Sequence, residues 1–138
     1  SKIANAKSIA DLKNAKLGAQ VGTTSYSTIT DIIKPNVEAS VFDTNDVAKQ
    51  ALENGQIDGL IVDLPTAFYI TAVELENGKI VGQFPAVENG EQFGLVLSKD
   101  SPLTKDVTKA VDALRKNGTL AKIAQEWLAQ VAGAPVLK

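Results

Sequence analysis

Short apolar runs alternate with stretches of helical periodicity along the first 97 residues of the chain. The apolar runs predict strands over residues 17–21, 37–42, 59–62, 79–83 and 92–97. Helical patterns lie between them, after Ser8, over residues 26–33, around residues 47–52 and over residues 65–75. Strands and helices that alternate over short connections predict an α/β fold, in which helices cover both faces of a mostly parallel sheet.

Polar residues at the helix ends support these boundaries. Ser8 and Asp11 have the spacing of a capping box, so a short helix is expected to begin after Ser8. Asp43 or Thr44 can cap the next helix pattern, and the pair Asn54-Gly55 is typical of a helix end.

The pattern becomes purely helical after Lys99. Ser101-Pro102 is expected to cap a helix that ends at Asn117-Gly118, and Thr119 restarts a second helix. Trp127 is interpreted as a packing residue of the second helix, and residues 131–138 as an irregular tail. Each helix carries an apolar stripe: Leu103, Val107, Ala110, Val111 and Leu114 on the first, and Leu120, Ile123, Ala124, Trp127 and Leu128 on the second.

Two predicted strands end in residues that suit ligand binding. Gly22, Thr23, Thr24 and Ser25 follow the first strand, where a helix start favours an anion, and Asp63 follows the third. Ligands of open α/β sheets bind at the carboxyl ends of strands, so this pair of loops predicts a site for a zwitterion such as an amino acid. The alternatives are that a hydroxyl among Thr23–Ser25 only caps the helix, and that Asp63 is a solvated acid at a helix start.

Composition excludes several classes of protein. The 138 residues are 44% hydrophobic and 22% charged, as expected for one globular domain, and no apolar run is long enough to span a bilayer. A net charge of -2 gives no basic surface for nucleic acid. The absence of Cys and His excludes disulfides, imidazole catalysis and His metal sites, and we expect no metal or cofactor. Residues 1–10 lack the apolar core of a signal peptide, so they do not indicate a location.

The order and spacing of several short motifs resemble those of a known family. The chain is similar, over essentially its whole length, to the second lobe and C-terminal helices of polar amino-acid-binding proteins, the extracytoplasmic receptors of ABC importers with the type II periplasmic-binding-protein fold. The motifs are Asp11-Leu12-Lys13, the segment 18–24, Ala51-Leu52 to Asp58-Gly59, Asp63-Leu64-Pro65, Phe93-Gly94, Ser101-Pro102-Leu103 and Gly118-Thr119 to Trp127.

The resemblance implies a role for each residue of the two loops. Thr23 and Thr24 would contact the carboxylate of an amino acid, and Asp63 would pair with its ammonium group. Gln20 and Ser25 are expected to contribute side-chain contacts or to line the rim.

The resemblance also implies a division of the chain. Residues 1–97 would form the second lobe with a crossing strand at its end, and the helices of residues 98–138 would pack on a first lobe that this sequence lacks. The arginine that grips the ligand carboxylate in the family cannot be matched to Arg115. We therefore expect a separate chain with the first lobe, a second copy of this chain in a swapped dimer, or the chain's own sheet to cover the two apolar stripes.

Three classes of function follow. The first is a non-enzymatic half-site for amino-acid binding in a receptor that works with ABC transporter membrane subunits outside the cytoplasm. The second is a dehydratase-like enzyme on the same fold, with Glu88 or Glu91 as its acid. The third is a phosphate or nucleotide binder, which lacks the lysine-containing phosphate loop and in which Asp63 would repel the ligand. The first is the prediction.

Overall fold

The computed structural model describes residues 1–85, 93–129 and 134–138, apart from the side chains of Leu128 and Ala129. The chain divides into two compact units. Unit 1 comprises residues 1–85 together with residues 134–138, and unit 2 comprises residues 86–133. The two units are described separately below.

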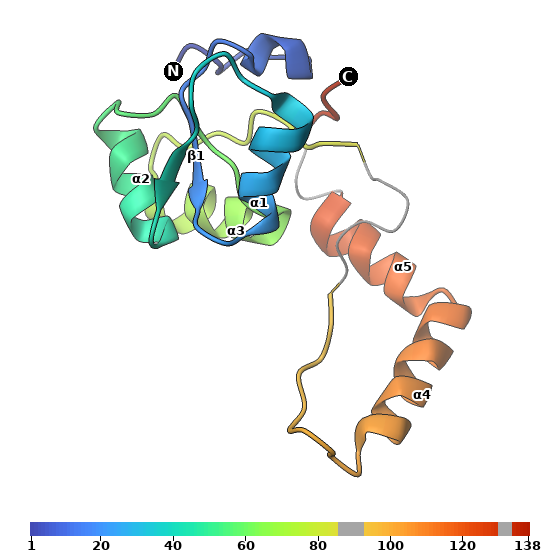
Figure 1. The fold of residues 1–138 in the computed structure, drawn as a ribbon. Coiled ribbons are helices and arrows are strands. Elements are labelled where there is room, and N and C mark those ends of the chain that lie inside the picture. Colours follow the sequence, from blue (N-terminus) through green and yellow to red (C-terminus); the bar gives the residue numbers. More distant parts are fainter. Residues whose placement is uncertain (86–92, 130–133) are drawn as a thin grey trace. The chain divides into compact units, whose positions relative to one another are not determined.

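Unit 1 contains a parallel sheet of three strands, β1 (Leu17–Gln20), β2 (Ser40–Phe42) and β3 (Gly59–Leu60). The strand order is β2-β1-β3, with Gly18 opposite Ser40 on one side of β1 and opposite Leu60 on the other. Figure 1 shows β1 among the helices of unit 1. The predicted parallel sheet is therefore confirmed, with strands shorter than the apolar runs.

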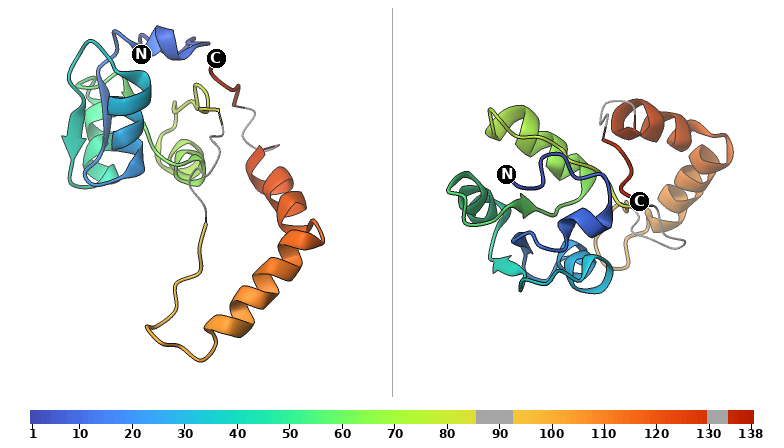
Figure 2. Two further views of the ribbon diagram at one scale, coloured as in Figure 1. Left: turned by 45° about the vertical axis from the view of Figure 1, so that its right-hand side comes forward. Right: turned by 90° about the horizontal axis from the view of Figure 1, so that it is seen from above.

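Helices connect the strands and cover the sheet. The 3₁₀-helix η1 (Ile9–Leu12) precedes β1, and α1 (Thr24–Ser27) continues into η2 (Thr28–Ile33). Helix α2 (Asn45–Glu53) leads to β3, and α3 (Leu64–Tyr69) continues into η3 (Ile70–Glu74). The chain crosses from β1 to β2 and then back past β1 to β3, so right-handed crossovers put α1 and α2 on opposite faces of the sheet (Figure 2).

The predicted helix boundaries of unit 1 are confirmed by side-chain caps. The Ser8 hydroxyl accepts a hydrogen bond from the Asp11 amide, and the Asp11 carboxylate accepts one from the Ser8 amide. Thr44, rather than Asp43, caps α2 by accepting a hydrogen bond from the Val47 amide. Asn54 and Gly55, with a φ of 69° at the glycine, end that helix as predicted.

The core of unit 1 surrounds β1. Leu17 and Ala19 are fully buried, as expected for a central strand of a parallel sheet, and Ile29 and Ile33 of η2 join them in one cluster. Gly18 lies under the Phe42 ring, where a β-carbon would come within 2.6 Å of the ring edge. The core of unit 1 thus joins the strand β1 to the helical segment η2.

Residues 79–83 do not form the predicted strand of the sheet. Instead, Gln83 makes an isolated parallel bridge with Val136, at the other end of the chain. The described part of the tail, residues 134–138, belongs to unit 1 and buries Ala134 and Leu137. These residues form no helix or strand apart from this one bridge, as expected for an irregular tail, but they are packed against unit 1.

Unit 2 contains α4 (Thr104–Lys116) and α5 (Thr119–Ala124), which continues into η4 (Gln125–Ala129). Helix α4 begins at Thr104 and not after Ser101, because the Ser101 carbonyl and hydroxyl accept hydrogen bonds within a turn that precedes the helix. Residues 93–97 form no strand in the structure, and Gln92, Glu88 and Glu91 lie outside the described residues.

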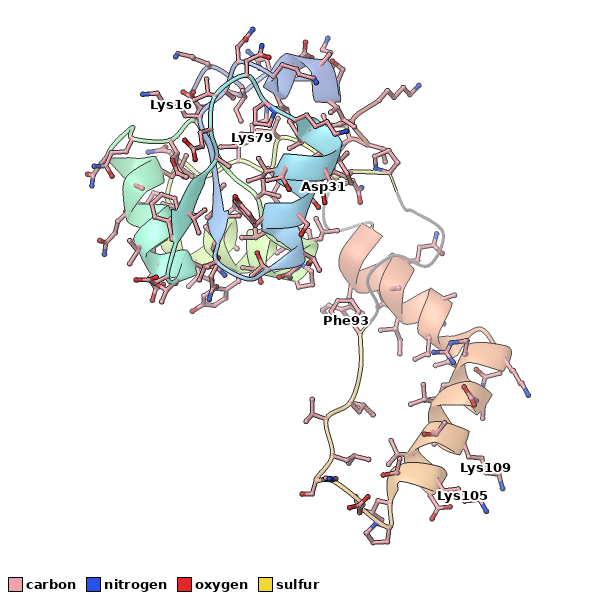
Figure 3. The ribbon with its side chains drawn as sticks, in the orientation of Figure 1. Lys16, Asp31, Lys79, Phe93, Lys105 and Lys109 are labelled. Carbon is pink, nitrogen blue, oxygen red and sulfur yellow. The ribbon has the colours of Figure 1, made fainter. Side chains whose placement is uncertain are left out.

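Apolar side chains of unit 2 are exposed. Trp127 is 65% exposed and Phe93 80% exposed, while Val107 and Val111 of α4 are half-buried. Lys105 and Lys109, one turn apart, project from the same side of α4 (Figure 3). The predicted apolar stripes thus have little cover in the described structure, and Trp127 is not a buried packing residue there.

Candidate ligand-binding site

The two loops singled out in the sequence leave the same edge of the sheet. The loop of residues 21–23 follows β1, and that of residues 61–63 follows β3, which pairs directly with β1. The connection from β1 leads to β2 on one side, whereas β3 lies on the other side, so the strand order reverses between these two loops. Open α/β sheets bind their ligands at such a switch point.

The first loop is shaped by Gly22 and Thr23. Gly22 has a φ of 70° in open space, a conformation that glycine adopts without strain. The Thr23 hydroxyl donates a hydrogen bond to the Gln20 carbonyl (2.7 Å) and accepts one from the Tyr26 amide (3.3 Å). Thr23 is therefore the N-cap of α1, as the plainer alternative for this loop proposed.

The amides of Thr24 and Ser25 are the groups that this loop can offer to an anion. They are the first two of α1, so they have no acceptor within the helix. The peptide dipoles of the helix add positive potential at the same point. Thr24 is exposed and Ser25 half-buried, and both also carry hydroxyl groups that can donate.

Asp63 is the acidic group of the second loop. It is exposed and caps α3, accepting hydrogen bonds from the Thr66 amide to Oδ1 (3.0 Å) and from the Thr66 hydroxyl to Oδ2 (2.8 Å). A carboxylate has about four acceptor positions. Asp63 therefore keeps further acceptor positions for a cation while it caps the helix.

Thr66 is the residue that the sequence reasoning missed. Its hydroxyl and amide both hold the Asp63 carboxylate, which fixes the direction of the acid at the strand end. The spacing Asp63-Leu64-Pro65-Thr66 is that of an N-cap and its N3 residue, so this signal was present in the sequence.

Gln20 has a different surrounding from the loop residues. It is half-buried at the end of β1, opposite Phe42 of β2. Its carbonyl is occupied by the Thr23 hydroxyl, so only its side chain can take part in binding. The structure thus brings Gln20, Gly22, Thr23, Thr24 and Ser25 to one strand end and Asp63 to the adjacent strand end.

Acidic side chains follow two of the strands at this edge. Asp43 follows β2 and is exposed, like Asp63 after β3. Lys49 of α2 pairs with Glu74 (3.2 Å) and Asp46 (3.8 Å), and its hydrogen bond with Glu74 raises the pKa of the Lys49 amine. In contrast, Lys16 and Lys79 lie at the end of unit 1 where β1 begins (Figure 3).

The described residues were also compared with the requirements of a metal site and of a membrane-spanning helix. Within residues 1–85, 93–129 and 134–138, no group of three or more acidic side chains is placed to hold a metal ion. In the same part of the chain, no helix has the length and apolar character needed to cross a membrane.

Comparison with known proteins finds relatives that are named as amino-acid-binding proteins. No protein-family model matches the chain. The ABC transporter arginine-binding protein 1 of Escherichia coli (strain K12) is 30% identical over 133 residues, which cover 90% of this chain and 51% of that protein. The L-cystine-binding protein TcyJ of the same strain is 26% identical over 133 residues, covering 96% and 47%.

The fold agrees with the relationship seen in the sequences. The solved structure of an ancestral arginine-binding protein bound to glutamine matches with a TM-score of 0.62 and 32% identity, over 89% of this chain and 54% of that one. The chain spans about half the length of the curated relatives it matches.

Proposed function

Because the chain is homologous to amino-acid-binding proteins of ABC transporters over about half their length, we propose that it carries one half of an amino-acid site. In this proposal the amides and hydroxyls of Thr24 and Ser25 bind the ligand carboxylate, and Asp63 binds its ammonium group. Thr23 shapes the first loop as its cap. Gln20 contributes its side chain at the rim, and Gly22 permits the turn.

The position of Asp63 at the switch point of the sheet carries this proposal. A negative group after β3 and a helix start after β1 are the complement of a zwitterion, whose two charges are separated by one carbon atom. A phosphate dianion would be repelled by Asp63, which disfavours a phosphate binder. The named relatives are binding proteins of transporters, which supports a function without chemistry.

A half-site has a low affinity for its ligand. Tight sites bury most of the ligand surface and add charged hydrogen bonds such as those of a bidentate arginine, which these two loops lack. The chain alone is expected to bind amino acids with a Kd of about 1 mM or weaker, equivalent to about 4 kcal/mol.

The apolar side of unit 2 is the surface at which we expect the remainder of the receptor to pack. Leu103, which precedes α4, Leu114 of α4 and Trp127 of η4 expose apolar area that a first lobe would bury. Each such side chain contributes about 1.5–3 kcal/mol when fully buried. The first lobe is the expected partner, and a swapped second copy of the chain is the competing arrangement.

The setting of this function follows from the same relatives. We propose that the complete receptor is extracytoplasmic, delivers its amino acid to ABC transporter membrane subunits, and uses no cofactor. The identity of the amino acid depends on contacts from the other lobe, so arginine, glutamine and glutamate all serve as probes.

An NMR titration of the whole ¹⁵N-labelled chain tests the half-site. L-arginine, L-glutamine and L-glutamate at millimolar concentrations should shift the amide signals of Thr24, Ser25 and Thr66. Saturable shifts confined to another region of the chain would overturn the proposal. Calorimetry that finds micromolar or tighter binding would show that the site is complete in this chain, which contradicts a half-site.

A further inference from the structure

The tail of the chain is bound to unit 1 through Gln83. The Gln83 amide donates to the Pro135 carbonyl, and the Leu137 amide donates to the Gln83 carbonyl, both at 2.9 Å. The Gln83 side-chain amide donates to the Ala134 carbonyl, also at 2.9 Å. The tail therefore lies against Gln83 as a short parallel strand would.

One side chain of the tail enters the core of unit 1. Leu137 is 3% exposed and belongs to the same cluster as Ile3, Leu12 and Leu17, whereas its neighbour Val136 is 49% exposed. Gly82 leaves room for Leu137, because a β-carbon on Gly82 would lie 2.7 Å from both Cγ and Cδ2 of Leu137. The amide of Ile9, the first residue of η1, also donates a hydrogen bond to the Lys138 carbonyl at 3.1 Å. The C-terminus accordingly lies beside η1 (Figure 2).

We propose that Gly82, Gln83 and the core around Leu12 form a strand-docking groove in unit 1, and that its occupant is the chain's own segment 134–138. Main-chain hydrogen bonds to Gln83 provide the attachment, and the pocket over Gly82 selects an apolar side chain at the position of Leu137. This is independent of amino-acid binding, because none of these residues belongs to the two ligand loops.

Docking of the tail changes how residues 86–133 are connected to unit 1. With the tail docked, this segment leaves unit 1 after Pro85 and returns to it at Ala134, beside Gln83. With the tail released, only the connection after Pro85 remains. The groove thus gives the chain an attachment to unit 1 at residues 134–138, in addition to the covalent connection at Pro85.

Amide hydrogen exchange of the whole chain, followed by NMR, tests the groove directly. The amides of Gln83 and Leu137 should exchange more slowly than that of Val136, for which the structure gives no acceptor among the described residues. Exchange of all three amides at the same fast rate would overturn the proposal.

A matched pair of tail variants separates the loss of docking from the general effect of adding a charge to the tail. Leu137→Asp puts a charge into the pocket, so the Gln83 amide should exchange about 10- to 100-fold faster, the factor expected when one leucine loses its burial. Val136→Asp adds the same charge at an exposed position and should leave that rate within about twofold. Equal effects of the two variants, or no effect of Leu137→Asp, would contradict the groove.

Gly82→Ala provides a second test in case Leu137→Asp does not fold. The added methyl group occupies the space of Leu137 without changing the tail, so exchange at both the Gln83 and Leu137 amides should become faster. Gly94→Ala, at a position with open space around it, is the control and should change neither rate. Unchanged protection in Gly82→Ala would show that the tail does not use this groove.

Discussion

Asp63 and Thr66 are joined by two hydrogen bonds, since Oδ1 of the acid accepts from the Thr66 amide at 3.0 Å and Oδ2 from the Thr66 hydroxyl at 2.8 Å. The pair combines two functions in one carboxylate. It caps α3, and it holds a negative charge in a fixed direction at the carboxyl end of β3. One carboxylate can therefore cap the helix and also pair with the ammonium group of a ligand.

Replacement of Asp63 by asparagine should separate these two functions. Asn is as good an N-cap as Asp, so the free energy of unfolding should change by less than about 1 kcal/mol. The lost charge should weaken amino-acid binding about 10- to 100-fold, as expected for a hydrogen bond to a charged group. The NMR titration with L-arginine and L-glutamine measures this change.

Asp43→Asn is the control for Asp63→Asn, because Asp43 is also an exposed acid that follows a strand at this edge. It should leave the amide shifts at Thr24, Ser25 and Thr66 nearly unchanged. An equal loss of binding in both variants would mean that general charge, and not pairing with Asp63, attracts the ligand.

Gly18→Ala should destabilise unit 1 by about 1–3 kcal/mol, the usual cost of excess volume in a packed core. The new methyl group would lie 2.6 Å from Cε2 of Phe42 and 2.9 Å from Cδ1 of Ile57, so neighbours on both sides have to move. Urea unfolding followed by circular dichroism measures the change, with Gly94→Ala as the unstrained control. Equal stability of Gly18→Ala and the parent chain would contradict the packing around β1.

The stability of unit 1 should decrease in acid partly through Asp11. Its carboxylate accepts hydrogen bonds from the amides of Lys7 and Ser8, and these bonds, with the Ser8 side chain, lower the pKa of Asp11. A lowered pKa stabilises the folded state above the ordinary carboxyl pKa of about 3.9, and this contribution is lost as the pH falls through the lowered value.

Urea midpoints measured between about pH 5 and pH 2 check this dependence. Asp11→Asn should show a smaller decrease in stability over that interval than the parent chain. Glu38→Gln, at an exposed position, should retain the decrease of the parent. A parent-like decrease in Asp11→Asn would show that the capping box does not contribute to acid sensitivity.

The fluorescence of the single tryptophan should report whether a partner covers the apolar stripes of unit 2. Trp127 is 65% exposed, so its fluorescence in the chain alone should resemble that of indole in water and be readily quenched by acrylamide. Association with a first lobe, or with a second copy of the chain, should shift the emission to shorter wavelength and reduce quenching. A blue-shifted, protected emission from the monomer would contradict the exposed stripe.

Features that depend on near neighbours in the sequence could be predicted well. Ser8, Thr44 and Asn54 were assigned to helix ends because a cap needs only residues a few positions away. The buried strand β1 was recognisable because Leu17, Gly18 and Ala19 form a short apolar run that a turn residue, Gly22, soon follows. The position of Asp63 at a strand end followed in the same way, although the hold of Thr66 on it was overlooked.

Features that depend on distant partners could not be predicted in this way. Residues 79–83, with Ile80 and Val81 at their centre, resemble a sheet strand, but Gln83 pairs with Val136, more than fifty residues away. Nothing near Leu137 in the sequence indicates that it completes a core formed by Ile3 and Leu12. Helix α4 begins at Thr104 because Ser101 uses its acceptors in a turn, a choice that the Ser-Pro pair alone does not determine.

A crystal structure of the chain grown with a saturating amino acid, such as L-glutamine, tests the central claim most directly. The account predicts the ligand carboxylate within hydrogen-bond distance of the Thr24 and Ser25 amides and the ammonium group within that distance of Asp63. A ligand bound with the two groups exchanged, or bound away from the ends of β1 and β3, would contradict it.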